Sequence, residues 1–251
     1  MKLKKLNCFI FLLLIILIFI IIFNNINNSS YCDGGVISFT FDDGTIDQYI
    51  NAYPIFSKYN ITGTNYIIAG LVGNKFENKT LMNWSHIKEL QNSNWELASH
   101  TLTHNDMTKM NDSQIEFEFS ESKRILNNNG FNIISVSIPY GHYNDQIKLI
   151  AKKYYNSIRP STWGYNDINN FDKYNISSIW ITNRTQMSFL KKIVDNTLIN
   201  NTWTVFMLHL VTTNNSYEYS IHPNILENLI NYIKAKQIEI KTVSEIIMCD
   251  R

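Results

Sequence analysis

Hydrophobic positions in this chain form short uninterrupted runs, and stretches with helical spacing lie between them. The runs have the length and the Val, Ile and Phe content of strands buried in an α/β core. We expect strands at residues 36–41, 64–69, 95–98, 133–138, near 157, 177–181, 204–208 and 239–241. We expect helices at residues 49–59, 84–91, 113–128, 146–154, 187–198, 224–236 and in a short terminal segment. Strands that alternate with helices predict a mostly parallel α/β sheet, and a chain of this length favours a closed or nearly closed barrel over an open sheet.

The apolar run at the N-terminus differs from the others in its length and in its flank. It spans residues 8–23 without a charged residue, and it follows Lys2, Lys4 and Lys5. A basic flank before such a run predicts a segment that enters a membrane, with the lysines on the cytoplasmic side. Because no small-residue cleavage pattern follows, an uncleaved signal anchor is favoured over a cleaved signal peptide. A buried core helix is the remaining alternative, and the lack of a polar face argues against it.

This segment sets the expected domain organisation. Residues 1–23 form the anchor, residues 24–34 a polar linker, and residues 35–251 one globular domain. We expect that domain on the extracytoplasmic or luminal side of the membrane, or secreted if the signal is cleaved. Cys32 and Cys249 bracket the domain and could pair in such an oxidising compartment.

The charge of the chain argues against a nucleic-acid partner. The formal net charge is +1, and removing the three N-terminal lysines from the 22 basic residues leaves 19 against 21 acidic ones. This balance provides no basic face for a phosphate backbone. We expect a monomer that contacts the membrane through its N-terminal segment alone.

Polar side chains with acid–base or metal chemistry stand just after several of the predicted strands. Asp42 and Asp43 follow the first strand and precede Gly44, His100 follows the third strand, and His209 follows the seventh. In parallel barrels, active sites are built at the rim formed by the carboxyl ends of the strands. The simpler interpretation of the two aspartates is a turn that only ends a strand. The residues on the other strands must decide between these interpretations.

His100 and His104 are spaced so that both imidazoles can reach one metal ion from a compact loop. A purely structural histidine pair is the alternative. Adding one carboxylate from the first rim segment gives a His2Asp set with open positions for water and substrate, as a catalytic zinc ion requires. The two aspartates would then divide into a base and a metal ligand.

Three short motifs carry these residues. The sequence TFDDG stands at residues 40–44, HTLTH at residues 100–104 and FMLH at residues 206–209. They resemble TFDDG, H-[ST]-x-x-H and L-x-L-H of the polysaccharide deacetylase family, the NodB-type carbohydrate esterases of family four. The resemblance covers about residues 36–247. It implies a distorted (β/α) barrel of about seven or eight mostly parallel strands.

Carried onto this sequence, the resemblance implies a division of roles. Asp42 would be the general base, and Asp43, His100 and His104 would hold a divalent metal. Zinc is the expected metal, with cobalt or a similar ion as the alternative. His209 would be the general acid.

Two further motif segments would contact the substrate. By the resemblance, Leu208 lines a pocket for the acetyl methyl group. Pro139 and Tyr140 belong to a P-Y-G turn, and the backbone N–H of Tyr140 would stabilise the oxyanion of the reaction.

The chain also departs from the family pattern. The third family motif, R-x-P-[YFW]-G, reads SIPYG at residues 137–141, so Ser137 stands where an arginine orients the base. A serine cannot supply a bidentate cationic partner, and we expect Arg159 to take over this role, with a surface arginine as the alternative. The family's Asp-Trp motif is absent, and Trp163 and Asp167 are loose candidates for its neighbourhood.

The resemblance favours a metal-dependent hydrolase that removes acetyl groups from polysaccharides containing N-acetylglucosamine, such as chitin or peptidoglycan. An esterase that acts on O-acetylated glycans is one alternative, because the same metal site serves both reactions. A carbohydrate-binding relative without catalysis is the other. Aromatic side chains could stack on sugar rings or belong to the core, namely Trp84, Trp163, Trp180 and Tyr140.

Overall fold

The computed structural model describes residues 35–249 of the chain. The predicted anchor, the predicted linker and Cys32 lie outside the described residues, so the anchor and the Cys32–Cys249 pairing stay predictions. No helix among residues 35–249 is both long and apolar enough to cross a membrane.

A nine-stranded sheet forms the centre of the described domain. Its strands run in the order β7-β6-β5-β2-β1-β10-β8, with β13 also paired to β1 and β9 also paired to β10. The strands are β1 Val36–Phe41, β2 Thr64–Ile67, β5 Glu96–Ser99, β6 Ser135–Ser137, β7 Ser157–Arg159, β8 Asn166–Asp167, β9 Ile179–Trp180, β10 Thr202–Leu208 and β13 Glu239–Ile240. Every pair is parallel except β8 with β10. The parallel pairing brings the carboxyl ends of these strands to one rim.

The sheet curls into a half-barrel. The opening between β7 and β9 is bridged by residues 173–176, because Ile158 donates its N–H to Lys173 O and accepts from Ile176 N. These two bonds are 2.9 and 3.0 Å long. The predicted distorted (β/α) barrel is therefore confirmed.

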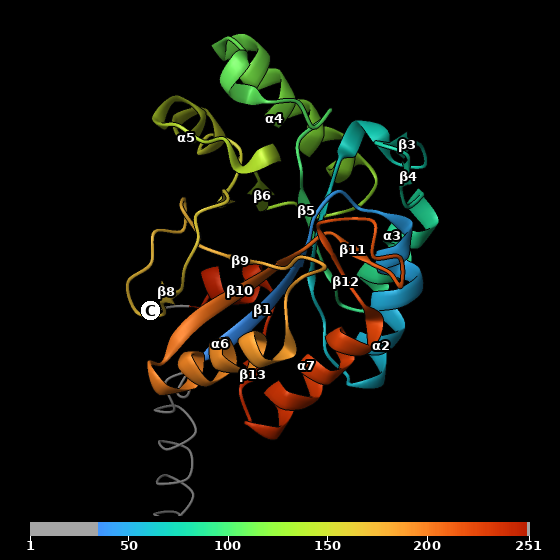
Figure 1. The fold of residues 1–251 in the computed structure, drawn as a ribbon. Coiled ribbons are helices and arrows are strands. Elements are labelled where there is room, and N and C mark those ends of the chain that lie inside the picture. Colours follow the sequence, from blue (N-terminus) through green and yellow to red (C-terminus); the bar gives the residue numbers. More distant parts are fainter. Residues whose placement is uncertain (1–34, 250–251) are drawn as a thin grey trace, which may run out of the picture. The chain divides into compact units, whose positions relative to one another are not determined.

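Helices surround the sheet (Figure 1). In this view α2 and α3 lie along one side, α6 and α7 below, and α4 and α5 beyond β5 and β6. Their bounds are α2 Tyr53–Lys58, α3 Trp84–Asn92, α4 Asp112–Asn128, α5 Asp145–Ala151, α6 Met187–Ile199, α7 Pro223–Ala235 and α8 Val243–Ile247. The first predicted helix is divided, since a π-helical turn, η1 (Gln48–Ala52), precedes α2 and Pro54 stands in the first turn of α2.

Helix α4 shows how local sequence sets these elements. Asn111 caps its N-terminus and forms a reciprocal capping box with Gln114. One face of α4 is buried, and its buried members recur at helical spacing: Ile115, Glu118, Phe119, Ser122 and Leu126. The predicted apolar face is therefore present, with a carboxylate inserted into it.

Several short elements were not predicted from the sequence, because two or three residues carry no readable periodicity. They are the hairpin β3 Lys75–Phe76 and β4 Lys79–Thr80, the pair β11 Leu210–Val211 and β12 Ser220–Ile221, and the 3₁₀ turns η2 Ala69–Leu71, η3 Met107–Lys109 and η4 Pro139–Gly141.

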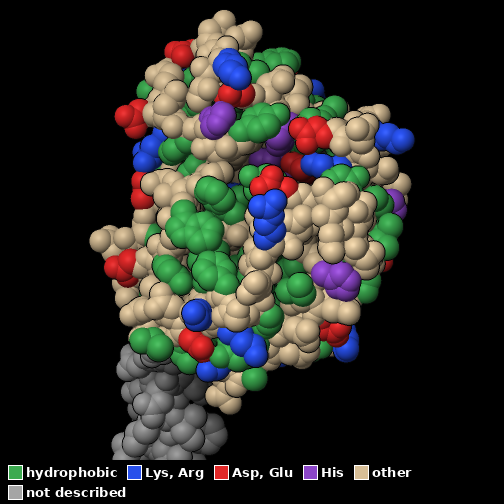
Figure 2. Space-filling model, viewed as in Figure 1, with side chains coloured by type: hydrophobic (Ala, Val, Ile, Leu, Met, Phe, Trp, Pro, Cys, Tyr) green, Lys and Arg blue, Asp and Glu red, His purple; other side chains and the backbone are tan. Residues whose placement is uncertain are grey.

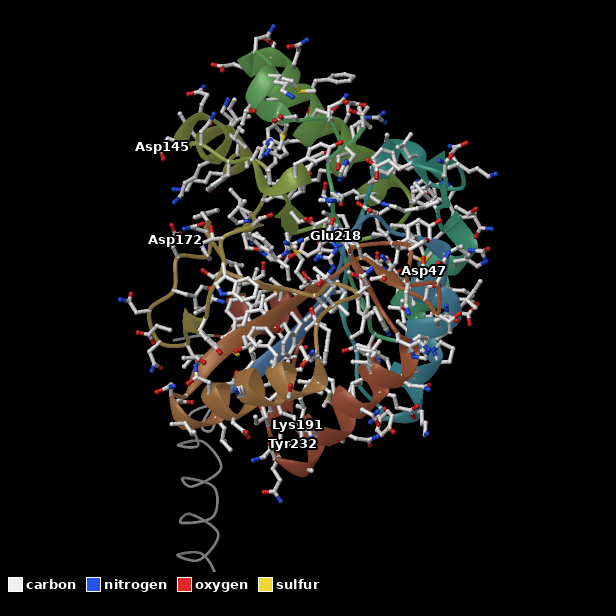
Figure 3. The ribbon with its side chains drawn as sticks, in the orientation of Figure 1. Asp47, Asp145, Asp172, Lys191, Glu218 and Tyr232 are labelled. Carbon is white, nitrogen blue, oxygen red and sulfur yellow. The ribbon has the colours of Figure 1, made fainter. Side chains whose placement is uncertain are left out.

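The helical layer and the rim of the barrel differ in character. In Figure 3, Glu218 lies near the middle of the view, whereas Lys191 and Tyr232 lie at the lower end, where α6 packs on α7. There the Tyr232 hydroxyl donates to Asp195, and the Lys191 ammonium lies 5.0 Å from the Tyr232 ring centroid. These contacts join two helices outside the sheet, whereas the chemistry-bearing side chains follow the carboxyl ends of the strands.

Candidate active site and metal centre

Asp42 and Asp43 follow β1 directly, and the backbone turns sharply between them and the next residue. Asp43 has φ 71° and Gly44 has φ 73°, both in the left-handed region. Each aspartate is only 3% exposed. The turn sends the two neighbouring carboxylates into different surroundings, as a division of roles requires.

Asp43 lies beside the two predicted histidines. Its Oδ1 atom is 3.4 Å from His104 Nε2 and 3.6 Å from His100 Nε2. One ligand atom from each residue lies within 4.8 Å of the others. Asp43 Oδ1 is buried and accepts no hydrogen bond from any described residue. A buried carboxylate oxygen that faces two imidazole nitrogens fits a divalent metal ion.

The loop that carries the two histidines is held from α4. The Glu118 carboxylate accepts hydrogen bonds from the backbone N–H groups of Leu102 and Thr103, both 2.9 Å long, and from the Thr103 hydroxyl. Thr101 and His104 adopt left-handed φ values of 64° and 61°. Glu118 thus satisfies the donors of a strained loop and fixes the spacing of the ligands.

Ser137 orients His100 through the ring nitrogen that does not face Asp43. Its Nδ1 atom lies 2.6 Å from Ser137 Oγ and 3.1 Å from Ser137 O. This leaves Nε2 to face Asp43. The serine that replaces the expected arginine therefore contacts a histidine of the metal set, which is how outer partners orient metal ligands.

Asp42 pairs with Arg159, which belongs to β7. The Arg159 Nη2 atom donates to both carboxylate oxygens of Asp42, at 2.5 and 2.6 Å. Arg159 is 1% exposed, and its guanidinium lies 5.0 Å from the Tyr66 ring centroid and 2.8 Å from Met207 Sδ. The contact expected of Arg159 is present, and the alternative of a surface arginine is wrong.

The surroundings shift the ionisation of both aspartates. Burial alone would raise the pKa of Asp42, but the Arg159 cation, with His100 and His209, holds that pKa below its usual value. For Asp43, burial is likewise outweighed, here by the three histidines and Lys79, so the pKa of Asp43 is also lowered. Both carboxylates are therefore ionised at neutral pH.

Burial acts in the opposite direction on the histidines, because it disfavours their charged form. It lowers the pKa of His100, and burial together with His100 lowers the pKa of His104 to about 3. Neutral imidazoles are the form that binds a metal ion.

His209 follows β10, the parallel neighbour of β1, and approaches Asp42 from that adjacent strand end. Its Nε2 atom is 3.9 Å from Asp42 Oδ2, and its side chain is partly exposed. Its Nδ1 atom is buried and has no hydrogen-bond partner among the described residues. Asp42 is thus the carboxylate that lies close to this imidazole.

Gln48, in η1, connects the segments that carry Asp42 and His209. Its Nε2 atom donates to Asp42 O at 2.5 Å and to His209 O at 2.8 Å, and its Oε1 atom accepts from Asn65 at 2.8 Å. This buried amide fixes the two strand ends relative to each other. Sequence reasoning missed Gln48, since its only signal is a polar residue within an otherwise apolar helical face.

The hairpin β3–β4 places a lysine against the metal set. Lys79 Nζ lies 3.3 Å from Asp43 Oδ2 and 3.2 Å from Glu77 Oε2. Phe76, in the same hairpin, packs its ring edge-on against His104, with centroids 4.8 Å apart. The sequence reasoning identified neither residue, because nothing in a six-residue polar hairpin marks its distant partner.

The two aspartates, His100, His104, His209 and Lys79 open into one cavity of about 490 Å³. Figure 2 shows histidine, acidic and basic side chains at the hollow on the upper part of the visible face. The lining includes Asp42, Asp43, His100, His104, Tyr140, Trp180, Met207, His209 and Glu218. A cavity with convergent polar groups and shifted pKa values is the expected form of an active site.

Comparison with known proteins identifies the family. The family model described as polysaccharide deacetylase matches residues 31–156, half of the chain. The chain belongs to the polysaccharide deacetylase family. The matched part contains Asp42, Asp43 and the two histidines, whereas Arg159 and His209 lie beyond it and are placed by the geometry.

Two curated relatives of this family are similar over part of their length. A putative polysaccharide deacetylase of Bacillus subtilis, YxkH, is 29% identical over 118 residues, which is 47% of this chain and 41% of the relative. A poly-β-1,6-N-acetyl-D-glucosamine N-deacetylase of Staphylococcus aureus is 32% identical over 124 residues, 45% of this chain and 43% of the relative. The matches thus span less than half of these relatives.

A solved structure extends the likeness beyond the family match. The Streptococcus pyogenes deacetylase PplD, in complex with acetate, is 26% identical, has a TM-score of 0.59 and aligns with 68% of this chain and 75% of its own. The barrel of this chain is therefore the fold of a family deacetylase.

Two expectations about the substrate pocket need correction. Leu208 is fully buried and does not line the cavity, whereas Met207 and Leu210 do. Side chains alternate along a strand, so Met207 shares the face of His209 and Leu208 points to the other face. Pro139 is also buried and does not line the cavity, whereas Tyr140, the other residue expected from this turn, does.

For Asp167 the expected neighbourhood is wrong, and for Trp84 the core alternative is the one that the structure bears out. Asp167 pairs with Thr202 at the start of β10, the end of that strand opposite to His209. Trp84 packs on the core with its ring stacked on Phe131, 6.2 Å between centroids, and does not line the cavity. Trp163 and Trp180 contact each other, with Trp180 at the cavity.

Proposed function

We propose that this chain is a metal-dependent N-deacetylase of polysaccharides that contain N-acetylglucosamine, with Zn²⁺ as its metal. The observation that carries the proposal is the convergence of separate groups in one cavity. Asp43, His100 and His104 form a metal set, while Asp42 is held apart by Arg159 and lies 3.9 Å from His209. The Staphylococcus aureus relative, an N-deacetylase of poly-β-1,6-N-acetyl-D-glucosamine, supports the substrate class.

A divalent cation held by Asp43, His100 and His104 would supply a Lewis acid that activates water and polarises a carbonyl oxygen. Asp42, ionised beside Arg159, accepts the proton of the attacking water. Gln48 keeps the Asp42 and His209 segments at a fixed separation. His209 then donates a proton to the departing amine, so it must be protonated when the C–N bond breaks.

The walls of the cavity suit an acetylated sugar. Met207 and Leu210 provide apolar surface on the side of His209, where the acetyl methyl group would lie. Tyr140 stands opposite, 53% exposed, with left-handed backbone (φ 58°) and its ring 4.9 Å from that of His104. We assign its backbone N–H to the oxyanion and its ring to a sugar face. The structure of the similar deacetylase PplD contains acetate, the product that such a reaction releases.

The placement in the cell rests on the sequence. We propose that residues 1–23 anchor the chain and residues 24–34 tether it, so that the deacetylase domain, residues 35–251, faces the extracytoplasmic or luminal side. The domain would act as a monomer on polysaccharide outside the membrane.

Acetate release tests the proposal. The full-length protein, with zinc or cobalt added and then chelated, is incubated with β-1,6- and β-1,4-linked N-acetylglucosamine oligomers and with O-acetylated glycans. We expect metal-dependent acetate release from the N-acetylated oligomers, and His209→Ala should lower the turnover roughly 10²- to 10⁴-fold while metal still binds. Release from the O-acetylated glycans alone would support the esterase alternative. No release from any glycan by metal-loaded protein would support a binding protein without catalysis.

A further inference from the structure

Three aromatic side chains form a continuous row that begins inside the cavity and leaves it. Trp180, on β9, lines the cavity. Its ring meets Trp163 edge-on at 5.5 Å between centroids, and the Trp163 ring is stacked on Phe189 at 6.5 Å with an interplanar angle of 20°. We call Trp180, Trp163 and Phe189 the aromatic row.

The outer members of the row face solvent. Trp163 is 50% exposed and Phe189 is 43% exposed. Figure 2 shows hydrophobic side chains gathered over β9 and towards α6, on the same face as the hollow that holds the charged groups. Single exposed aromatic residues are common on protein surfaces and need no explanation. A group of exposed aromatic rings beside a polar site, in contrast, is typical of a binding surface.

The backbone holds the row in place. The segment that carries Trp163 runs beside β9, since Ser178 N donates to Thr162 O at 2.8 Å and Trp163 forms a parallel bridge with Ser178. On its other side the segment packs on the turn η4. A side chain on Gly141, which has φ 68°, would place its Cβ 1.9 Å from Ser161 Oγ. The aromatic rings are therefore presented by a fixed scaffold.

We propose that the aromatic row binds the sugar units next to the one that enters the cavity, and so selects long chains over short ones. This inference rests on the proposed function, because it takes the polysaccharide substrate as the occupant. A cavity of about 490 Å³ accommodates a ligand of ordinary small-molecule size, and the rest of a polymer must continue outside it.

The chemistry of the row fits a pyranose chain. Aromatic rings offer flat apolar faces to the C–H faces of sugars, at low conformational cost. The Trp180 side chain lines the cavity, so its ring can pack on the sugar unit that enters the cavity. Trp180 belongs to both the cavity and the row, which makes the cavity and the outer surface one continuous site.

The test compares substrates of increasing length. Acetate release is measured on N-acetylglucosamine oligomers from two to six units for the wild type, Trp163→Ala and Phe189→Ala. We expect the ratio of kcat/KM for the hexamer to that for the dimer to fall roughly three- to tenfold in both variants, mainly through KM. Phe117→Ala is the matched control, because Phe117 is 58% exposed on α4 and lies outside the row. An unchanged ratio in both row variants, or an equal fall in the control, would overturn the proposal.

A binding measurement separates this inference from the catalytic proposal. Retardation in a gel containing N-acetylglucosamine polysaccharide is measured for Asp42→Asn and for Asp42→Asn combined with Trp163→Ala. We expect the single variant to be retarded and the double variant to migrate faster. Retardation that the row substitution leaves intact would refute the aromatic row even if acetate release is found. A row-dependent retardation without acetate release would refute only the catalytic function.

Discussion

Asp42 and Asp43 are adjacent in the chain, yet their surroundings differ in kind. Asp42 faces a permanent cation, the Arg159 guanidinium, which is fully buried and donates to both carboxylate oxygens. Asp43 faces two imidazoles whose pKa values are lowered, and it keeps one oxygen without a hydrogen bond from the described residues. The Arg159 cation therefore keeps Asp42 ionised and able to accept a proton. Asp43 keeps an oxygen without a hydrogen-bond donor and is therefore able to bind a metal ion.

The largest effect is expected from a substitution that removes Asp43 from the metal set. Asp43→Asn removes the anionic ligand and nearly preserves the shape of the side chain. We expect zinc affinity to fall by more than the roughly 10- to 100-fold that loss of an outer partner causes, with activity lost in parallel. Calorimetric titration of the metal-free protein with zinc measures it. Near-normal zinc affinity in this variant would show that Asp43 is no ligand.

Asp42→Asn should separate catalysis from metal binding. The substitution removes the base, so we expect kcat to fall roughly 10²- to 10⁴-fold. Zinc affinity, measured by the same titration, should stay within a few-fold of the wild type, because Asp42 lies outside the metal set. A large loss of both zinc affinity and activity would mean that Asp42 also serves the metal site, and that the two aspartates do not have separate functions.

Arg159→Met tests what the permanent cation does for Asp42. Without it, burial dominates and the pKa of Asp42 rises, so the acid limb of the kcat/KM profile should move to higher pH. The lowered pKa of Asp42 also predicts how the stability of the fold depends on pH. The lowered pKa means that the pair stabilises the fold above the ordinary carboxyl value of 3.8 and that this contribution is lost as pH falls through the lowered pKa.

The size of the stability effect and its control follow from burial. Removing one partner of a buried ion pair costs about 3–5 kcal/mol, which urea unfolding at neutral pH would detect. Arg124→Met removes an arginine that pairs with Glu121 on the exposed face of α4, and it should change neither measurement appreciably. An acid limb that stays in place in Arg159→Met would mean that Asp42 is not the base that the profile reports.

The same contrast explains what the sequence could predict. β1 and the two aspartates were predicted because an apolar run ending in Asp-Asp-Gly is a local pattern. The barrel was predicted because strands and helices alternate along the chain. Arg159 was expected to replace the missing arginine, and it contacts Asp42. Leu208, which the resemblance placed in the acetyl pocket, does not line the cavity, because the pleat of β10 turns Met207 towards the cavity and Leu208 away from it.

The supporting residues escaped prediction for a different reason. Gln48, Lys79 and Glu118 act through contacts with backbone groups or side chains that are distant in the sequence. A polar residue at such a position resembles any surface residue until the fold shows which distant group it contacts. The reactive groups therefore have sequence signatures, whereas the groups that orient them are recognised only in three dimensions.

Lys79 is the supporting residue that sharpens the comparison most. Its ammonium lies on the Asp43 oxygen turned away from the histidines, so the metal set carries a cation next to the place where a second cation would bind. Like charges at a partly buried site repel, and Lys79→Met should therefore tighten zinc binding about tenfold. Lys75→Met, on the exposed part of the same hairpin, should leave zinc affinity unchanged. Weaker zinc binding in Lys79→Met would mean that Lys79 orients the Asp43 carboxylate towards the metal. Asp43 would then depend on the Lys79 cation as Asp42 depends on the Arg159 cation.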